Sequence, residues 1–143
     1  MPRPNKHLDA VTTEYIEAYR MGVFIRTPIE NIAFFQAEHK AVVAHTKSNG
    51  AFILDVPLWQ IADTLKDQAL QVHRSYLVMN GILAGRSNWR KGSGWVFEVI
   101  TSVRVGNSLG AMPHIIPIGR RLINKVRAAL AKDAENYLKS IQE

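Results

Sequence analysis

Hydrophobic residues recur at helical spacing in three segments of the chain. In residues 8–20 the apolar side chains fall on one helical face and the charged ones elsewhere, which predicts an amphipathic helix. A second helix is predicted at residues 57–66, where Pro57 suits the first helical position and an apolar stripe follows. Helical spacing returns from Gly119 to Ile141, so a C-terminal helix is predicted there.

Between these helices the chain has the pattern of short strands, rich in β-branched and aromatic residues. Strands are predicted at residues 23–26, 29–35, 41–47, 51–56, 70–78, 82–86, 95–105 and 113–118. Residues 87–94 and 106–110 are predicted loops. The strongest hairpin signal is Ser48-Asn49-Gly50, because Asn-Gly tolerates the positive φ angles of a tight turn.

These elements predict a mainly β fold with one short internal helix and helical N- and C-terminal extensions. The expected division is an N-terminal helical extension at residues 1–22, a β-domain at 23–127 and a C-terminal helical extension at 128–143. No internal repeat or low-complexity linker interrupts the chain, and 143 residues suit one compact domain.

Composition narrows the class of protein. The chain is 47% hydrophobic, which suits a folded core, and it has no cysteine, which excludes disulfides, thiolate nucleophiles and cysteine-based metal sites. There is no apolar run near the ~18 residues of a membrane span. The first seven residues lack the apolar core of a secretory signal. We therefore expect a cytoplasmic protein.

The positive charge is concentrated in one part of the sequence. The net charge is +6, but residues 73–127 hold nine basic residues and one acid, Glu98, so this stretch carries +8 and the remainder −2. Such asymmetry favours a polyanionic partner, most simply nucleic acid. A solvated basic surface without a nucleic-acid partner is the alternative.

The residues that usually carry catalysis form no recognisable site. His39 and His45 have the even spacing that would place them on one face of a strand, but no third ligand is spaced to complete a metal site. His73 and Ser75 share a strand face without the strand–turn–helix context of a nucleophilic serine. Gly92-Ser93-Gly94 lacks the helix that follows a phosphate-binding loop. We expect neither enzymatic activity nor a cofactor.

Two motifs point instead to a family. His73-Arg74-Ser75-Tyr76-Leu77-Val78 follows the predicted internal helix, and Ile116-Pro117-Ile118-Gly119-Arg120-Arg121 leads into the C-terminal helix. This arrangement resembles the LytTR-type DNA-binding domain of bacterial response regulators, which has a Val-His-Arg-Ser-Tyr-Leu-Val-Asn strand and a later Ile-Pro-Val-Ser-Arg-Arg segment. The family's earlier segments resemble residues 31–37, 42–52 and 58–65, so the resemblance covers roughly residues 23–127.

The resemblance implies an elongated β-strand fold whose loops enter successive major grooves of DNA. It also implies paired operator repeats bound by two protomers. The expected function is therefore that of a sequence-specific transcriptional regulator that binds double-stranded DNA as a homodimer. With only about 22 residues before the domain, no receiver domain is expected.

The sequence departs from the family pattern at three places. Met79 stands where the family has asparagine, Gly119 replaces a serine and thereby removes a hydroxyl contact, and the segment 86–114 is longer than usual.

The resemblance also assigns site residues. Arg74 and Arg121 match groove-facing positions and are expected at base edges, and Arg120 at a phosphate. His39 or Lys40 is the nearest match to a DNA-contacting loop residue, with a plain solvent loop as the alternative. The basic loop near residue 90, which also contains Trp89, is expected either to add phosphate contacts or to insert beside DNA, and Arg90 and Lys91 are assigned to phosphates. The candidate DNA-binding residues are His39, Lys40, Arg74, Arg86, Arg90, Lys91, Arg120 and Arg121. For His73 we expect a half-buried residue hydrogen-bonded to backbone, with a base contact as the alternative. Tyr76 and Val78 are expected to pack in the core rather than to stack on bases.

Two rival functions stay open. One is a protein–protein or signalling module that keeps the fold without DNA binding. The other is an RNA-binding β-domain that stacks bases on Tyr76 and the tryptophans. The apolar stripes of the terminal helices either pack on their own domain or support self-association, and we expect self-association.

Overall fold

The computed structural model describes residues 9–20, 22–48, 50–80, 88–91 and 95–129. In this part of the chain, strands form three antiparallel sheets, and the mainly β fold is confirmed. The first sheet has the order β1-β2-β3 and consists of Ala10–Val11, Tyr15–Arg20 and Val23–Pro28. None of the helical segments in the described ranges has the length and hydrophobicity of a membrane span.

The helix predicted at residues 8–20 is wrong, because this segment forms β1 and β2. Ile16 and Ala18 are fully buried and alternate with more accessible neighbours, which is the period of a strand. Tyr15 and Tyr19 lie four residues apart, a spacing that places two side chains on one face in a helix and in a strand alike. The Thr12 hydroxyl accepts a hydrogen bond from the backbone N–H of Tyr15 at 3.0 Å and closes the turn between the strands.

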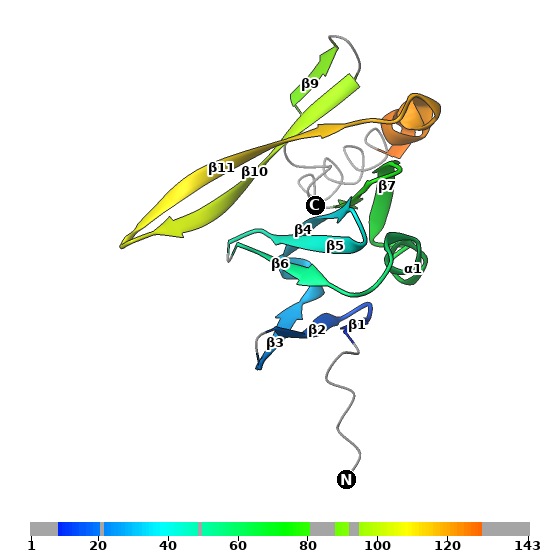
Figure 1. The fold of residues 1–143 in the computed structure, drawn as a ribbon. Coiled ribbons are helices and arrows are strands. Elements are labelled where there is room, and N and C mark those ends of the chain that lie inside the picture. Colours follow the sequence, from blue (N-terminus) through cyan, green and yellow to red (C-terminus); the bar gives the residue numbers. More distant parts are fainter. Residues whose placement is uncertain (1–8, 21, 49, 81–87, 92–94, 130–143) are drawn as a thin grey trace, which may run out of the picture.

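A five-stranded sheet with the order β6-β5-β4-β8-β7 forms the centre of the fold (Figure 1). Its strands in chain order are β4 (Ile32–Glu38), β5 (Ala41–Thr46), β6 (Ala51–Leu54), β7 (Ala69–His73) and β8 (Tyr76–Met79). The short 3₁₀ helix η1 (Ile29–Asn31) leads into β4. The predicted β5–β6 hairpin is confirmed, and Gly50 in its turn has a φ of +82°.

The predicted strand at residues 70–78 is a hairpin instead, formed by β7 and β8 around a turn at Arg74-Ser75. The backbone N–H of Ser75 donates to His73 Nδ1 at 3.1 Å, so a side-chain bond closes this turn. No glycine, proline or asparagine marks the position. The predicted helix before the hairpin is confirmed as α1 (Leu58–Thr64), and the predicted strand at 82–86 lies outside the described residues.

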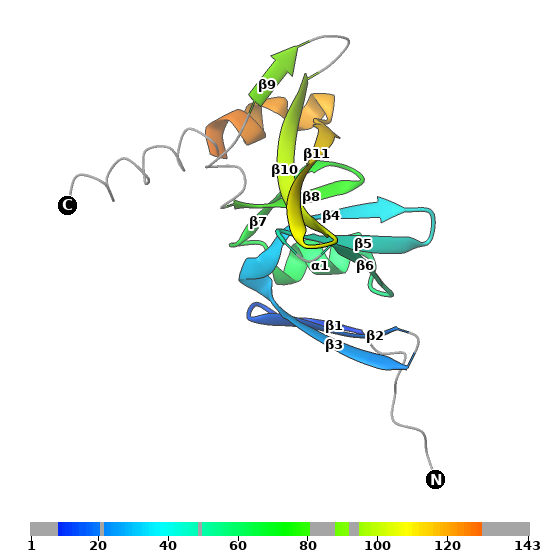
Figure 2. The same ribbon diagram turned by 90° about the vertical axis from the view of Figure 1, so that its left-hand side faces the viewer.

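The third sheet is dominated by a long hairpin of β10 (Trp95–Val105) and β11 (Ser108–Pro117), with β9 (Asn88–Lys91) beside the start of β10. Figures 1 and 2 show this hairpin crossing one face of the five-stranded sheet and projecting past its edge. Two predicted loops are thus partly wrong, since residues 88–91 and 108–110 are strand. Residues 108–112 lack β-branched side chains, and pairing along β10 makes them a strand.

The five-stranded sheet has a hydrophobic core on each face. One core joins β4, β5, β6 and β8 to α1 and β2 and includes Ile16, Phe35 and Ile61. The other joins the opposite face to β10, β11 and the C-terminal helical segment, and it includes Phe34. Val126 in this segment is fully buried in the second core.

The described parts of both terminal segments therefore pack on their own domain. The predicted C-terminal helix is confirmed as far as residue 129, through η2 (Arg120–Leu122) and helical residues 123–129. Residues 130–143, which complete the predicted C-terminal extension, lie outside the described residues, and the domain boundaries at 22 and 127 stay predictions.

Candidate nucleic-acid interface

Two turns that carry predicted site residues lie at the same end of the five-stranded sheet. Strand β4 runs antiparallel to both β5 and β8. The backbone N–H of Ala37, near the end of β4, donates to the carbonyl of Ser75 at 2.8 Å. The β4–β5 turn with His39 and Lys40 is therefore next to the β7–β8 turn with Arg74. All three side chains are exposed.

The segment after β11 is tied to the same end of the sheet. Ile118 is buried, and the backbone N–H of Gly119 donates to the carbonyl of Val72 at 2.8 Å. This bond fixes the start of η2 against β7, so that the exposed Arg120 and Arg121 come close to Arg74.

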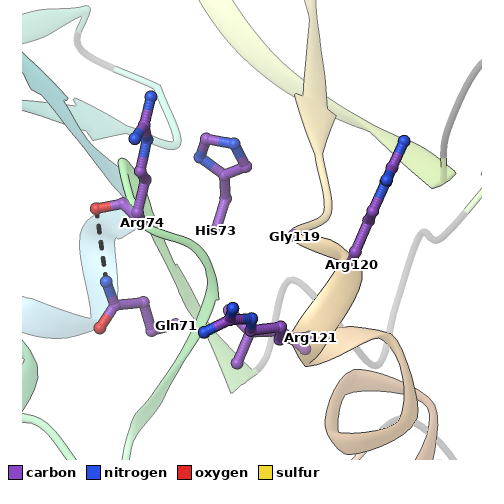
Figure 3. A pocket seen from close by; sticks show the side chains of 7 residues that line it. Gln71, His73, Arg74, Gly119, Arg120 and Arg121 are labelled. Carbon is purple, nitrogen blue, oxygen red and sulfur yellow. Dashed lines mark hydrogen bonds between the residues drawn. The ribbon is translucent and has the colours of Figure 1, made fainter.

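The three arginines border one open cleft of about 640 Å³, which we call the arginine cleft. Figure 3 shows Arg74 and Arg120 on either side of His73, with Arg121 below them near Gln71. The cleft is lined by Gln71, His73, Arg74, Gly119, Arg120, Arg121 and Leu122. Within the described part of the chain, no carboxylate pairs with any of the three guanidinium groups, and all three side chains are exposed to solvent.

Hydrogen bonds around the β7–β8 turn fix the backbone that carries Arg74. The Gln71 side-chain amide donates to the carbonyl of Arg74 at 3.4 Å, drawn dashed in Figure 3. His73 is half-buried, accepts from the Ser75 N–H, and contacts the ring of Tyr76 edge-on at 5.8 Å between centroids. The expectation that His73 is a half-buried residue bonded to backbone is therefore confirmed. Val78 is fully buried and Tyr76 packs against the second core, as predicted.

The comparisons with known proteins bear on the family and on the fold. The family model of the LytTr DNA-binding domain matches residues 22–97. The chain belongs to the LytTR family. Among solved structures it is similar to the LytTr DNA-binding domain of a methyl-accepting/DNA response regulator from Bacillus cereus. The TM-score is 0.59 and the identity 14%, over 82% of this chain and 96% of that chain. No curated protein matches the sequence.

Gly119 stands where the LytTR pattern has a serine, but its backbone conformation does not require glycine. Gly119 has φ −63° and ψ 138°, which any residue adopts. A Cβ added there would meet the Leu122 side chain at 3.6 Å and the backbone of residues 72 and 73 at 3.8 Å. These are ordinary van der Waals contacts, so the position accommodates a serine.

Three of the predicted LytTR site residues belong to the longer segment 86–114. Arg86 lies outside the described residues. Arg90 and Lys91 are in β9, where Arg90 pairs with Val96. Because Val96 also pairs with Pro117, just before η2, the backbone of β9 lies at the end of the long hairpin from which η2 begins. The backbone of β9, which carries Arg90 and Lys91, is therefore on the side of the domain that holds Arg120.

His39 and Lys40 border a second depression of about 420 Å³ rather than the arginine cleft. We call it the apolar hollow; its lining consists of Glu38, His39, Lys40, Ala41, Val43 and Ile53. His39 has a φ of +56° in the tight turn. The sequence does not identify Val43 and Ile53 as lining residues, because strand alternation alone does not tell which apolar face is left uncovered.

His45, which the sequence pairs with His39 by even spacing, lies in a different environment. Its ring stacks on Phe34 at 4.2 Å and meets the ring of His114 edge-on at 5.1 Å, and its Nε2 is 3.2 Å from Gln36 Oε1. His114 Nε2 lies 2.9 Å from Thr101 Oγ1. These contacts join the five-stranded sheet to the β10–β11 hairpin. We call this cluster of Phe34, Gln36, His45, Thr101 and His114 the histidine joint.

The histidine joint keeps its imidazoles uncharged. Burial, and secondarily the neighbouring His114, lowers the pKa of His45 to about 4, and burial also lowers the pKa of His114. In the described ranges no three His, Asp or Glu residues gather as metal ligands would. The joint is therefore a packing contact of this LytTR domain, and its basic residues present no charge at neutral pH.

Proposed function

We propose that this LytTR protein is a transcriptional regulator that binds double-stranded DNA sequence-specifically through the end of its five-stranded sheet. The observation that carries the proposal is the arginine cleft. Arg74 comes from the β7–β8 turn and Arg120 and Arg121 from η2, yet all three are exposed and unpaired with carboxylates in the described structure. A polyanion is the partner that such a cluster favours.

The chemistry of the three side chains separates affinity from specificity. A guanidinium group binds guanine O6 and N7 in a bidentate manner, whereas a contact to phosphate carries no sequence information. We assign Arg74 and Arg121 to base edges and Arg120 to phosphate. The turn that holds Arg74 is fixed by the His73–Ser75 and Gln71–Arg74 hydrogen bonds, which supports a defined geometry at a base.

The β4–β5 turn supplies the second set of contacts. Neighbouring strands are about 4.8 Å apart, so the β4–β5 and β7–β8 turns are separated by about 10 Å, or roughly three base-pair steps. His39 and Lys40 thus contact the same stretch of DNA as Arg74. Arg86, Arg90 and Lys91 are proposed phosphate contacts.

We also propose that two protomers bind paired operator repeats, as the family resemblance implies. The buried positions of Ile16 and Val126 within their own domain give no support to a dimer through the terminal segments. The dimer contact is therefore proposed to form on DNA, where repeat spacing brings two protomers together.

The test is a selection with the full-length chain and a pool of random duplex DNA, followed by titration of the enriched duplex. The proposal expects one enriched sequence, bound more tightly than a scrambled duplex and more tightly than either single strand. Enrichment of no duplex sequence, together with tighter binding of a single strand than of duplex or with no binding of nucleic acid, would overturn it. These outcomes correspond to the RNA-binding and signalling alternatives.

A further inference from the structure

The apolar hollow combines an uncovered hydrophobic floor with a polar rim. Val43 on β5 pairs with Ile53 on β6, so their side chains share one face of the sheet, and Ala41 lies on the same face two residues before Val43. Strand β6 is the edge of the sheet (Figure 1) and Ile53 is 53% exposed. The floor is thus accessible to a ligand that binds at the β4–β5 turn.

The uncovered floor is confined to one end of its sheet face. Farther along the same face, Phe34 and Val78 are buried under the β10–β11 hairpin and the helical segment after it. The hairpin therefore covers the middle of the face but not the end that carries the β4–β5 turn. This end is the one that holds Arg74 in the adjacent turn.

The rim of the hollow includes a carboxylate, which is absent from the lining of the arginine cleft. Lys40 presents hydrogen-bond donors, and Glu38, at the end of β4, presents a carboxylate acceptor. The arginine cleft presents guanidinium donors, which suit guanine. The two depressions, although neighbours, therefore favour different base pairs.

We propose that the apolar hollow recognises the 5-methyl group of thymine in an A·T base pair. In the major groove thymine offers this methyl group beside its O4 acceptor, and adenine offers the N6 amino donor. The floor of Ala41, Val43 and Ile53 contacts the methyl, Lys40 donates to O4, and Glu38 accepts from N6. A G·C pair has no methyl group for the floor. The inference rests on the proposed DNA binding and makes it more specific.

The spacing of the two turns adds a geometric expectation. Since they are about 10 Å apart, the recognised thymine lies roughly three base pairs from the guanine bound by Arg74. Each half-site of the operator then contains a guanine and a thymine at this separation.

The experiment replaces each thymine of the selected duplex with deoxyuridine, one at a time, which removes only the methyl group. Binding is titrated with the full-length protein at one salt concentration. One buried methyl corresponds to about a fourfold change in affinity, so one or two positions are expected to lose about fourfold. Ile53→Ala is expected to abolish this loss at the same positions. Ile115→Ala, which truncates an isoleucine of β11 that is 48% exposed, is the matched control and should retain it.

The outcomes separate this inference from the proposed function. If a duplex is selected and bound but no uracil substitution weakens binding, the thymine inference is wrong and the proposed function stands. The inference is also wrong if Ile53→Ala keeps the full uracil penalty, because the methyl is then recognised elsewhere. If no duplex is enriched at all, the proposed function itself fails and the inference with it.

Discussion

The arginine cleft and the histidine joint are both made of basic side chains that distant hairpins bring together, yet they differ in what becomes of the charge. Arg74, Arg120 and Arg121 are exposed and unpaired with carboxylates in the described structure. The ring of His45 stacks on Phe34, and the ring of His114 meets both of these rings edge-on. Each imidazole is hydrogen-bonded to a side chain, and burial lowers the pKa of both. A cluster of basic residues therefore indicates an anionic partner only where the structure leaves the charge accessible.

The largest expected effect tests the structural role of the histidine joint. Phe34 is 1% exposed and contacts the rings of both His45 and His114. Phe34→Ala is expected to lower the free energy of unfolding by about 3–5 kcal/mol, because it leaves a cavity between the sheet and the long hairpin. Urea denaturation measures this. Trp59→Ala, at a side chain that is 71% exposed on α1, is the control and should change stability by less than about 0.5 kcal/mol. Equal effects of the two substitutions on the free energy of unfolding would contradict the structural role of the histidine joint.

The second prediction concerns acid. The pKa of His45 in the folded protein is about 4, below its ordinary value of 6.5, so the fold favours the neutral imidazole. Its contribution to stability is fully present above pH 6.5 and is lost as the pH falls towards 4. The loss is expected to be about 1–2 kcal/mol, less than the full shift implies, because solvent screens a partly accessible ring.

Denaturation between pH 7 and 4.5 measures this loss, and His45→Gln is the comparison. The free energy of unfolding of the variant should depend less on pH than that of the wild type. Both proteins contain the carboxylates that titrate in this range, so the difference between their curves reports the imidazole of His45. A wild-type curve that is parallel to that of His45→Gln would show that the joint does not exclude the charged imidazole.

The smallest effect is expected in the arginine cleft itself, at Gly119. Gly119→Ser is expected to change stability by less than about 0.5 kcal/mol, because φ is −63° and the added atoms meet only ordinary contacts. Gly106→Ser is the contrasting substitution, since Gly106 has a φ of +62°, and it should cost about 1 kcal/mol. Thermal unfolding compares the two variants. Equal destabilisation would mean that the cleft backbone is more tightly constrained than its contacts indicate.

Local signals in the sequence predicted part of the fold well. Asn49-Gly50 indicated the β5–β6 hairpin and the apolar stripe after Pro57 indicated α1, because in both the information lies within a few neighbouring residues. The helix predicted for the N-terminal segment is wrong because apolar residues four positions apart, such as Tyr15 and Tyr19, fit the period of a helix and that of a strand. The Arg74-Ser75 turn carries no turn-forming residue, so it was not visible as a hairpin.

The candidate site could be predicted only through the family motifs. Residue types alone indicated a polyanion, and the resemblance selected Arg74, Arg120 and Arg121, which the structure brings to one cleft. What joins them is the backbone bond from Gly119 to Val72, between segments that no local pattern connects. The pairing of His45 with His114 was likewise not predictable, because it depends on where the long hairpin crosses the sheet.

The central claim is that the exposed arginine at the β7–β8 turn recognises bases, and Arg74→Ala tests it most directly. The variant, the wild type and Arg26→Ala are titrated against the selected duplex and a scrambled duplex at two salt concentrations. Arg26 is the matched control, because it is an exposed arginine on β3, stacked 4.1 Å from the ring centre of Tyr15.

Arg74→Ala is predicted to cost about 1–3 kcal/mol on the selected duplex and to relax the preference at one base pair, with a much smaller effect on the scrambled duplex. Arg26→Ala is predicted to change the affinity for the selected duplex and for the scrambled duplex only by the small amount expected from the loss of one positive charge. Equal weakening of both duplexes by Arg74→Ala would make Arg74 a phosphate anchor and would contradict the account.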